Sequence, residues 1–284
     1  MKKQSVEQIG VCSWSLQATG PQDLAEKVKA VGVKKVQLGL VPHRDDQGAW
    51  DGTQEILSAS GIEVVSGMFS TIGEDYTTPA TIRKTGGVVL DEYWEENLKL
   101  AASAAASAAA MKLPTVTVHA GFLPHDPKDP EFDKLSGRVL QLVEIFGEHG
   151  VSLLLETGQE SAQTLLTFLD EMKKRGASTL AVNFDPANMI LYDMDDPIEA
   201  LRQLVPHVKQ THVKDAKRTK VKEQWGEEVI VGTGEVDWNA FVQILAEADF
   251  DGGLIFEREL GDNRIGDIKE GIKALTAAIN AVNG

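Results

Sequence analysis

Cysteine is almost absent from this sequence. Cys12 is the only one in 284 residues, which excludes an internal disulfide framework and any metal cluster held by several thiolates. A chain of this length buries most of its surface on folding and needs no such crosslinks. Hydrophobic residue types make up 42% of the sequence, an ordinary share for a globular protein, so we expect a conventional apolar core.

Positive charge and long apolar runs are also scarce. Lys and Arg number 28 against 43 Asp and Glu, a net charge of −15, whereas nucleic-acid-binding proteins normally present a basic surface. No stretch approaches the roughly 18 consecutive apolar residues of a membrane helix, and no apolar segment of a secretory signal follows the first lysines. We therefore expect a soluble, cytoplasmic protein with a small-molecule partner and neither a nucleic-acid nor a membrane partner.

Apolar, β-rich runs alternate with amphipathic helical stretches along the whole chain. The runs are 9–16, 34–40, 63–70, 115–121, 151–158, 180–187, 208–215 and 252–259. Their near-continuous hydrophobicity is typical of parallel strands buried on both faces. Eight such units in this length favour a closed (β/α)8 TIM barrel over an open doubly wound sheet. No linker composition interrupts the pattern, so we predict one domain spanning residues 1–284.

The helical stretches carry start and stop signals, and two connections are long. The segment 21–32 begins with proline and ends with glycine, as helices commonly do, and 195–207 and 236–250 begin with acidic residues. The connections 71–92 and 217–236 both follow strands, on the face where barrel enzymes bind their substrates. Long loops there are often lids, and Trp225 is expected either to cover the site or to form an oligomer contact.

Four potential metal ligands stand late in the last four apolar runs: Glu156, Asp185, His212 and Glu257. A single acid at a strand end is more often a helix cap or an ion-pair partner. Three buried carboxylates that converge would repel one another, whereas a divalent cation would compensate their charge. Three carboxylates and one imidazole suit Mn²⁺, Mg²⁺, Co²⁺ or Zn²⁺, and the lack of sulfur disfavours a structural zinc site.

The segments ETG, FDPAN, HVKDA, GTGEVDW and FERE, with CSWSL near the start, resemble the sugar phosphate isomerase/epimerase family. This family belongs to the xylose-isomerase-like TIM barrels and is related to tagatose 3-epimerase and hydroxypyruvate isomerase. The resemblance implies metal ligation by Glu156, Asp185, His212 and Glu257. It also implies that Glu156 and Glu257 are the catalytic pair that exchanges protons with the substrate.

The expected chemistry can be argued from the residues as well. Epimerising a ketose, or moving its carbonyl group, requires removal of a proton from the carbon beside the carbonyl. A divalent metal stabilises the resulting enediolate, while one carboxylate removes the proton and another returns it. We therefore predict a sugar (ketose or keto-acid) isomerase/epimerase that depends on one divalent metal ion, with Mn²⁺ preferred.

Five further residues are candidates for substrate binding: Trp14, His119, Asn188, Lys214 and Glu259. His119 either points at substrate or is a buried core histidine, and Trp14 either walls a sugar ring or packs in the barrel. Lys214 is expected to reach a substrate oxygen or pair with a carboxylate. Glu259 shares the strand face of the last ligand. Asn188 stands where tagatose-type epimerases have histidine, and asparagine cannot serve as a titrating acid.

Several alternatives remain open from the sequence. The same scaffold serves lyases, such as keto-inositol or dehydroshikimate-type dehydratases or enzymes that eliminate from 3-keto-glycosides, with His119 or Lys214 as general acid. A non-catalytic sugar-binding protein would retain the barrel. An endonuclease IV-like DNA repair enzyme needs more histidine ligands than the six histidines of this chain provide. No glycine-rich phosphate loop argues for a phosphorylated substrate. A homodimer and a homotetramer are both compatible with the sequence.

Overall fold

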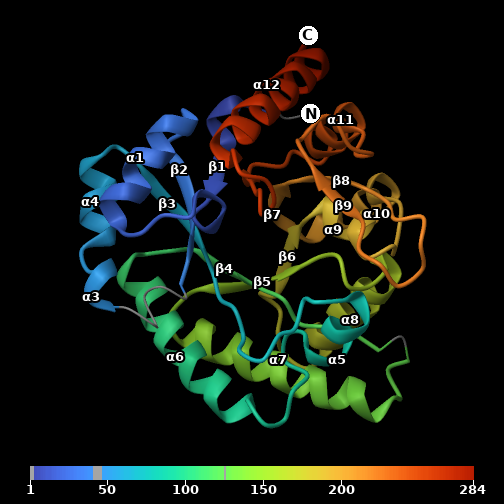
Figure 1. Cartoon of the computed structure of the whole chain (residues 1–284). Coiled ribbons are helices and arrows are strands. Elements are labelled where there is room, and N and C mark those ends of the chain that lie inside the picture. The colour runs from blue at the N-terminus through green and yellow to red at the C-terminus, as the bar shows by residue number, and fades with distance from the viewer. Residues whose placement is uncertain (1–2, 41–46, 125) are drawn as a thin grey trace.

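The computed structural model describes residues 3–40, 47–124 and 126–284. Eight parallel strands close into a barrel in the order β1-β10-β7-β6-β5-β4-β3-β2, surrounded by helices (Figure 1). The barrel strands are β1 (Ile9–Cys12), β2 (Lys35–Gly39), β3 (Glu63–Met68), β4 (Thr115–Val118), β5 (Ser152–Glu156), β6 (Ala181–Phe184), β7 (Val208–Val213) and β10 (Gly253–Phe256). The predicted (β/α)8 TIM barrel is confirmed.

The helices connect successive strands and bury their apolar faces against the barrel. They are α1 (Pro21–Val31), α3 (Gln47–Trp50), α4 (Thr53–Ala59), α5 (Pro79–Thr85), α6 (Trp94–Ala110), α7 (Pro130–Glu148), α8 (Ala162–Lys174), α9 (Pro186–Leu191), α10 (Pro197–Leu204), α11 (Trp238–Glu247) and α12 (Arg264–Asn283). Short 3₁₀ turns are η1 (Val6–Gln8), η2 (Trp14–Leu16) and η3 (Val205–His207). No helix within the described ranges is long and apolar enough to span a membrane.

The predicted helix boundaries agree with the structure where the local signals are strong. α1 ends at Gly32, whose φ of 94° lies in the left-handed region that favours glycine. The segment predicted as one helix over 195–207 instead divides into α10 and η3. Pro206 causes this division, because proline has no N–H to continue the hydrogen-bond pattern of the helix.

The strands are shorter than the apolar runs predicted, and this changes how the site residues are placed. β1 ends at Cys12, so Trp14 lies in the 3₁₀ turn η2 and does not end the strand as expected. β6 ends before Asp185, which is the N-cap of α9. His119 comes directly after the last residue of β4. The Asp185 carboxylate accepts hydrogen bonds from the backbone N–H groups of Ala187 and Asn188, so this residue begins a helix and does not extend the strand.

The two long connections contain more regular structure than expected. The connection 71–92 includes the helix α5, and 217–236 includes the strand β9 (Glu227–Val229). β9 pairs antiparallel with β8 (Asp215–Lys217), which comes directly after β7 (Figure 1). This hairpin fixes the connection 217–236 at the carboxyl end of the barrel.

A single buried carboxylate holds the glycine-rich end of this connection. Asp215 Oδ2 accepts hydrogen bonds from the backbone N–H groups of Gly232 (2.8 Å) and Gly234 (3.1 Å), and from the indole of Trp238 (3.1 Å). Its Oδ1 accepts from the N–H of Val236. A Cβ at position 234 would lie 2.0 Å from this carboxylate, so only glycine fits. The GTGEVDW motif therefore serves to close this loop onto Asp215.

We expect Asp215→Asn to destabilise the protein by about 2–4 kcal/mol, because the amide offers one acceptor oxygen to several buried donors. Urea unfolding followed by circular dichroism measures the change. Asp237→Asn is the matched control, since Asp237 caps α11 through Ala240 N–H and asparagine caps a helix equally well. Equal losses in the two variants would contradict the role assigned to Asp215.

Candidate metal centre and active site

Four side chains converge at the carboxyl end of the barrel. Glu156 is the last residue of β5, His212 is the penultimate residue of β7, and Asp185 and Glu257 come directly after β6 and β10. All four are buried, and each offers one ligand atom such that these atoms lie within 4.8 Å of one another. The structure thus brings together the residues that the sequence analysis selected as a metal site, although two of them lie just beyond their strands.

The imidazole of His212 is at the centre of this group. Its Nδ1 lies 3.2 Å from Glu156 Oε1, 3.6 Å from Glu257 Oε2 and 3.7 Å from Asp185 Oδ2. In the described part of the chain, His212 Nδ1, Glu156 Oε2 and Asp185 Oδ2 are buried and have no hydrogen-bond partner. Buried polar atoms normally have partners, and a divalent cation would supply one to each of these three. The residues present therefore fit a metal ion.

The second ring nitrogen of His212 is positioned by Gln37. The two groups lie 2.8 Å apart, His212 Nε2 to Gln37 Oε1. Gln37 Nε2 donates to the carbonyl of Gly67 and to Thr117 Oγ1, so its oxygen is left to accept from the imidazole. A neutral His212 then carries its hydrogen on Nε2 and presents the Nδ1 lone pair to the carboxylates. Metal-binding histidines commonly have their other nitrogen held in this way.

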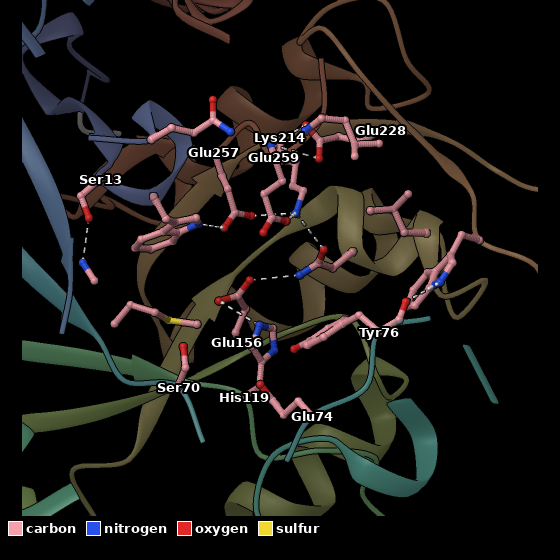
Figure 2. Close-up of a pocket in the computed structure, with 18 of the residues that line it drawn as sticks. Ser13, Ser70, Glu74, Tyr76, His119, Glu156, Lys214, Glu228, Glu257 and Glu259 are labelled. Carbon is pink, nitrogen blue, oxygen red and sulfur yellow. Dashed lines mark hydrogen bonds and ion pairs between the residues drawn. The ribbon is translucent and has the colours of Figure 1, made fainter. Parts of the chain in front are cut away.

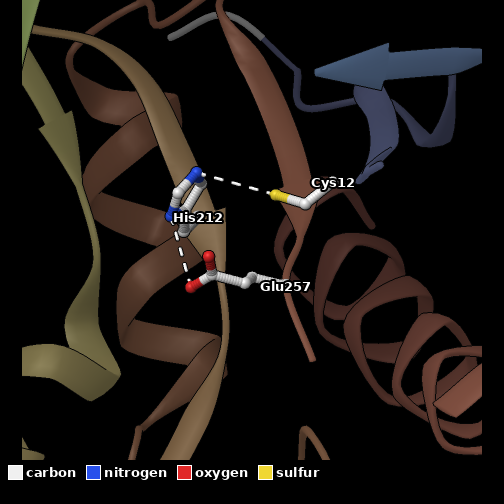
Figure 3. Close-up of side chains that lie close together, drawn as sticks. All are labelled: Cys12, His212 and Glu257. Carbon is white, nitrogen blue, oxygen red and sulfur yellow. Dashed lines mark hydrogen bonds and ion pairs between the residues drawn. The ribbon is translucent and has the colours of Figure 1, made fainter. Parts of the chain in front are cut away.

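Cys12 lies on the other side of the same imidazole (Figure 3). Its Sγ is 3.7 Å from His212 Nε2, and Cys12, His212 and Glu257 form a second group with the spacing of a metal site. The Nε2 atom is already engaged by Gln37, and the two ring nitrogens point in different directions. Burial also raises the pKa of the Cys12 thiol to about 12, which disfavours the thiolate. The oxygen-rich group around Nδ1 is therefore the better metal site.

The two glutamates of the centre differ in their affinity for protons. Burial raises the pKa of both carboxyl groups. At Glu156 the positive charges of His212, His119 and Lys214 outweigh burial and lower the pKa to about 2. At Glu257 burial outweighs the attraction of Lys214 and His212, and the pKa is raised to about 7. In the metal-free protein the Glu156 carboxyl group therefore binds a proton less readily than the Glu257 carboxyl group.

The cation nearest to Glu257 is Lys214. Its Nζ donates to Glu257 Oε2 (2.8 Å) and Glu259 Oε2 (2.7 Å). The other oxygen of Glu257 accepts from the indole N–H of Trp14 at 2.7 Å. Burial lowers the pKa of Lys214, but the carboxylates of Glu257 and Glu259 outweigh it and raise this pKa well above its ordinary value. Lys214 is thus a permanent positive charge beside the metal centre.

Asn188 and His119 complete the contacts of Glu156. Asn188 Nδ2 donates to Glu156 Oε1 at 3.0 Å, and its oxygen lies 3.5 Å from Lys214 Nζ. His119 Nε2 is 3.7 Å from Glu156 Oε2. The Nδ1 atom of His119 is buried and without a hydrogen-bond partner among the residues that the structure describes. His119 therefore lies beside this carboxylate with one buried ring nitrogen that no described residue satisfies.

A cavity of about 770 Å³ opens above the metal centre (Figure 2). Its walls include all five predicted substrate-binding residues: Trp14, His119, Asn188, Lys214 and Glu259. Asp185 and His212 are fully buried and do not line it, whereas Glu156 and Glu257 do. Deep, largely preformed cavities of this size with a few convergent polar groups are typical of substrate sites.

The cavity wall also contains residues that were not predicted from the sequence, among them Glu74, Tyr76 and Tyr192. Glu74 and Tyr76 come from the connection 71–92, and Figure 2 shows the Tyr76 side chain reaching toward His119 and Glu156. No periodicity places residues of an irregular segment, so their position depends on how the loop packs. The sequence offers one indication that these segments contribute to the site, which is the unusual length of the two connections at the carboxyl end of the barrel.

The two long connections meet across the mouth of this cavity. The indole N–H of Trp225 donates to the carbonyl of Tyr76 at 3.1 Å, and the Trp225 ring packs edge-on against Tyr192 at 4.9 Å. Glu228 accepts from Arg258 and from the backbone N–H of Glu259. Trp225, expected to cover the site, lies in the cavity wall.

Known proteins resemble this chain in sequence and in structure. The sequence profile of the xylose isomerase-like TIM barrel family matches residues 25–278. A xylose isomerase domain protein from Planctomyces limnophilus has a similar structure, with a TM-score of 0.82 and 31% identity over 91% of this chain and 92% of that one.

More distant solved structures share the fold alone. L-ribulose 3-epimerase has a TM-score of 0.70 and 15% identity, over 100% of this chain and 96% of that chain. A xylose isomerase-like TIM barrel protein from Mycobacterium smegmatis, in complex with magnesium, has a TM-score of 0.72 and 14% identity, over 97% of each chain.

Among curated proteins the chain is similar to the inosose dehydratase of Clostridium tetani. The two are 25% identical over 118 residues, which are 37% of this chain and 40% of the relative. The match thus spans about two fifths of the length of that enzyme. The family profile and the Planctomyces limnophilus structure cover most of the chain, and on these grounds the protein belongs to the xylose isomerase-like TIM barrel family.

Proposed function

We propose that the protein is a divalent-metal-dependent isomerase or epimerase of a sugar, acting on a ketose or keto acid. The observation that carries this proposal is the pair of buried carboxylates, Glu156 and Glu257, that meet at Nδ1 of His212. Two carboxyl groups this close to one another suit a reaction in which one group accepts a proton from the substrate and the other returns one. The epimerases among its structural neighbours support the same class.

In the proposed reaction the chain's own residues handle two protons and orient the substrate. The ionised Glu156 removes a proton from the carbon beside the substrate carbonyl, and Glu257 delivers one from the other side. Asn188 and Lys214 hold these carboxylates in place and offer hydrogen bonds to substrate oxygens. His119 lines the same cavity.

A divalent cation held by Glu156, Asp185, His212 and Glu257 would stabilise the negative charge of the enediolate. The donor set suits Mn²⁺, Mg²⁺, Co²⁺ or Zn²⁺, and we propose Mn²⁺ first. The magnesium in the Mycobacterium smegmatis neighbour supports a divalent metal in this fold.

A dehydratase is the second candidate, favoured by the similarity to inosose dehydratase. Elimination begins with the same proton removal and then expels a hydroxyl group, which must be protonated as it leaves. Lys214, which the neighbouring carboxylates keep protonated, and His119 both line the cavity and could supply that proton. The protein would therefore act as a dehydratase if Lys214 or His119 faces the hydroxyl group that leaves, and as an epimerase or isomerase if neither does.

We further propose that residues 1–284 form one domain and act in the cytoplasm on a small molecule, without a nucleic-acid partner. One barrel built from strands between Ile9 and Phe256 supports the single domain, and the net charge of −15 supports the absence of a nucleic-acid partner. A homodimer or homotetramer is compatible with this function.

Incubation of the metal-loaded protein with ketopentoses, ketohexoses and inososes in D₂O tests the reaction. We expect deuterium at the carbon beside the carbonyl and formation of the epimer or isomer, read by NMR. The dehydratase instead yields a product that has lost one water and absorbs as an enone. Glu156→Gln should lower either rate by at least about 100-fold, the usual contribution of a general base. If the protein catalyses neither deuterium exchange nor elimination on any sugar of the panel, the proposal is wrong.

Metal content tests the centre itself. We expect plasma emission to find about one divalent ion per chain after purification without chelator. Glu257→Gln should lower the affinity for the metal ion by at least about 100-fold, because replacing a direct ligand weakens binding at least as much as replacing a residue that only orients a ligand. Glu259→Gln is the matched control: it also loses a carboxylate bonded to Lys214 but lies outside the ligand set. A metal-free wild type whose melting temperature does not rise with added Mn²⁺ would refute the four-ligand site.

Metal binding should release protons at neutral pH. Burial disfavours the charged imidazolium, but the Glu156 and Glu257 carboxylates outweigh it and raise the pKa of His212 well above its usual value. The metal-free protein therefore holds a proton on His212 that a cation must displace, so affinity rises with pH and falls as pH is lowered. Calorimetry in two buffers of different ionisation enthalpy should give about one proton or more per ion. Release of none at pH 7 would contradict this assignment.

A further inference from the structure

We propose that the cavity takes a neutral two-ring substrate, a glycoside, whose keto-sugar ring lies over the metal centre. Its second ring would occupy an outer aromatic subsite formed by Tyr76, Tyr192 and Trp225. The orientation of the first ring rests on the proposed function, whereas the outer subsite is argued from its own geometry.

The size of the cavity is the first observation. Sites of about 300–1,000 Å³ enclose drug-sized molecules, and this cavity has about 770 Å³. A single sugar ring above Glu156 and Glu257 leaves much of that space empty. The cavity extends from these carboxylates to Trp225 and Leu260, so part of the remaining room lies beside Trp225; the wall also includes Gln17, Ala18 and Trp50.

The outer aromatic subsite is braced by contacts between segments far apart in the sequence. Trp225 donates its indole N–H to the carbonyl of Tyr76 and packs edge-on against Tyr192 at an interplanar angle of 74°. Tyr192 in turn packs edge-on against Phe122 at 5.7 Å, and Arg83 lies over the Phe122 ring. Rings held on both sides lose little freedom when a ligand binds.

Part of this wall presents apolar surface to the cavity. Tyr76 is 45% exposed and Leu260 is 54% exposed, and both line the cavity, whereas Tyr192 is buried. Exposed apolar surface gathered around a concave site marks a place where a ligand binds. The C–H face of a sugar ring or an aromatic aglycone suits such a wall, because Tyr and Trp offer broad apolar faces with polar edges.

The charge of the cavity selects against anionic groups. Its walls carry five carboxylates: Glu74, Glu156, Glu228, Glu257 and Glu259. Among the described residues that line it, the basic side chains are His119 and Lys214, and Lys214 already bonds two of these carboxylates. Arg258 pairs with Glu228, and the proposed cation would compensate Glu156 and Glu257. A phosphate or carboxylate on the second ring would still meet the negative charge of Glu74 and Glu259, so the second ring is expected to be uncharged.

Calorimetric binding of non-reacting sugars to the metal-loaded protein tests the subsite without requiring turnover. The probes are methyl and phenyl glycosides of glucose and galactose in both anomeric series, the disaccharides maltose and cellobiose, and glucose 6-phosphate. We expect at least one phenyl glycoside or disaccharide to bind roughly tenfold tighter than its methyl glycoside. Glucose 6-phosphate should bind more weakly than glucose.

Two variants of Trp225 distinguish the contribution of its aromatic ring from that of its indole N–H hydrogen bond. Trp225→Ala should abolish the tenfold preference while the affinity for the methyl glycoside changes less than about twofold. Trp225→Phe retains an aromatic ring but lacks the N–H that bonds to the Tyr76 carbonyl, and it should keep most of the preference. If Trp225 only held the two connections together through that hydrogen bond, Trp225→Phe would lose the preference as well. Val221→Ala is the control, since Val221 is an exposed residue of the same connection that does not line the cavity.

Three results would overturn the proposal. The first is equal affinity for the phenyl glycosides, the disaccharides and the methyl glycosides, and the second is no binding of any probe. The third is a preference for the second ring that remains in Trp225→Ala. Tighter binding of glucose 6-phosphate than of glucose would overturn the neutral class. The proposed function is judged separately by deuterium exchange and metal content. A protein that binds metal and exchanges protons on simple ketoses, yet shows no second-ring preference, would retain its function and lose only this subsite.

Discussion

Compensation of buried negative charge is the constraint on which the carboxyl end of this barrel depends. Glu156, Asp185 and Glu257 enter a buried space together, where an unpaired carboxylate is very costly. His212 stands among them, and Lys214 neutralises Glu257 from the cavity side. Even so, buried atoms of this group keep no hydrogen-bond partner in the described structure. A divalent cation held by these four residues would complete the balance of charge at this end of the barrel.

The same centre explains why isomerisation and dehydration are neighbouring possibilities on one scaffold. Both begin when a carboxylate removes a proton beside a carbonyl, and the asymmetry between Glu156 and Glu257 serves either course. The fate of the enediolate depends on the group that meets it next: a second carboxylate returns a proton, whereas Lys214 or His119 would protonate a leaving hydroxyl.

That wall is built by loops, and the loops are held by a few long-range contacts. Asp215 fastens the end of the connection 217–236, and the β8–β9 hairpin aligns its middle. Trp225 is thereby brought to Tyr76 across the mouth of the cavity. A barrel of regular strands can therefore carry a substrate-specific site, because the loops vary while the strands keep the metal centre in place.

The sequence by itself determined the barrel and the membership of the metal cluster. Eight continuous apolar runs separated by helices specify parallel strands, and an acid or histidine late in each of the last four runs must gather at one end. The sequence also indicated which further residues lie near this cluster: Trp14, His119, Asn188, Lys214 and Glu259. Only the tertiary structure decided that Trp14 and Lys214 hold Glu257, and that Tyr76 meets Trp225. Periodicity specifies which way a strand residue faces, but contacts between irregular loops depend on the packing of distant segments, which no local pattern encodes.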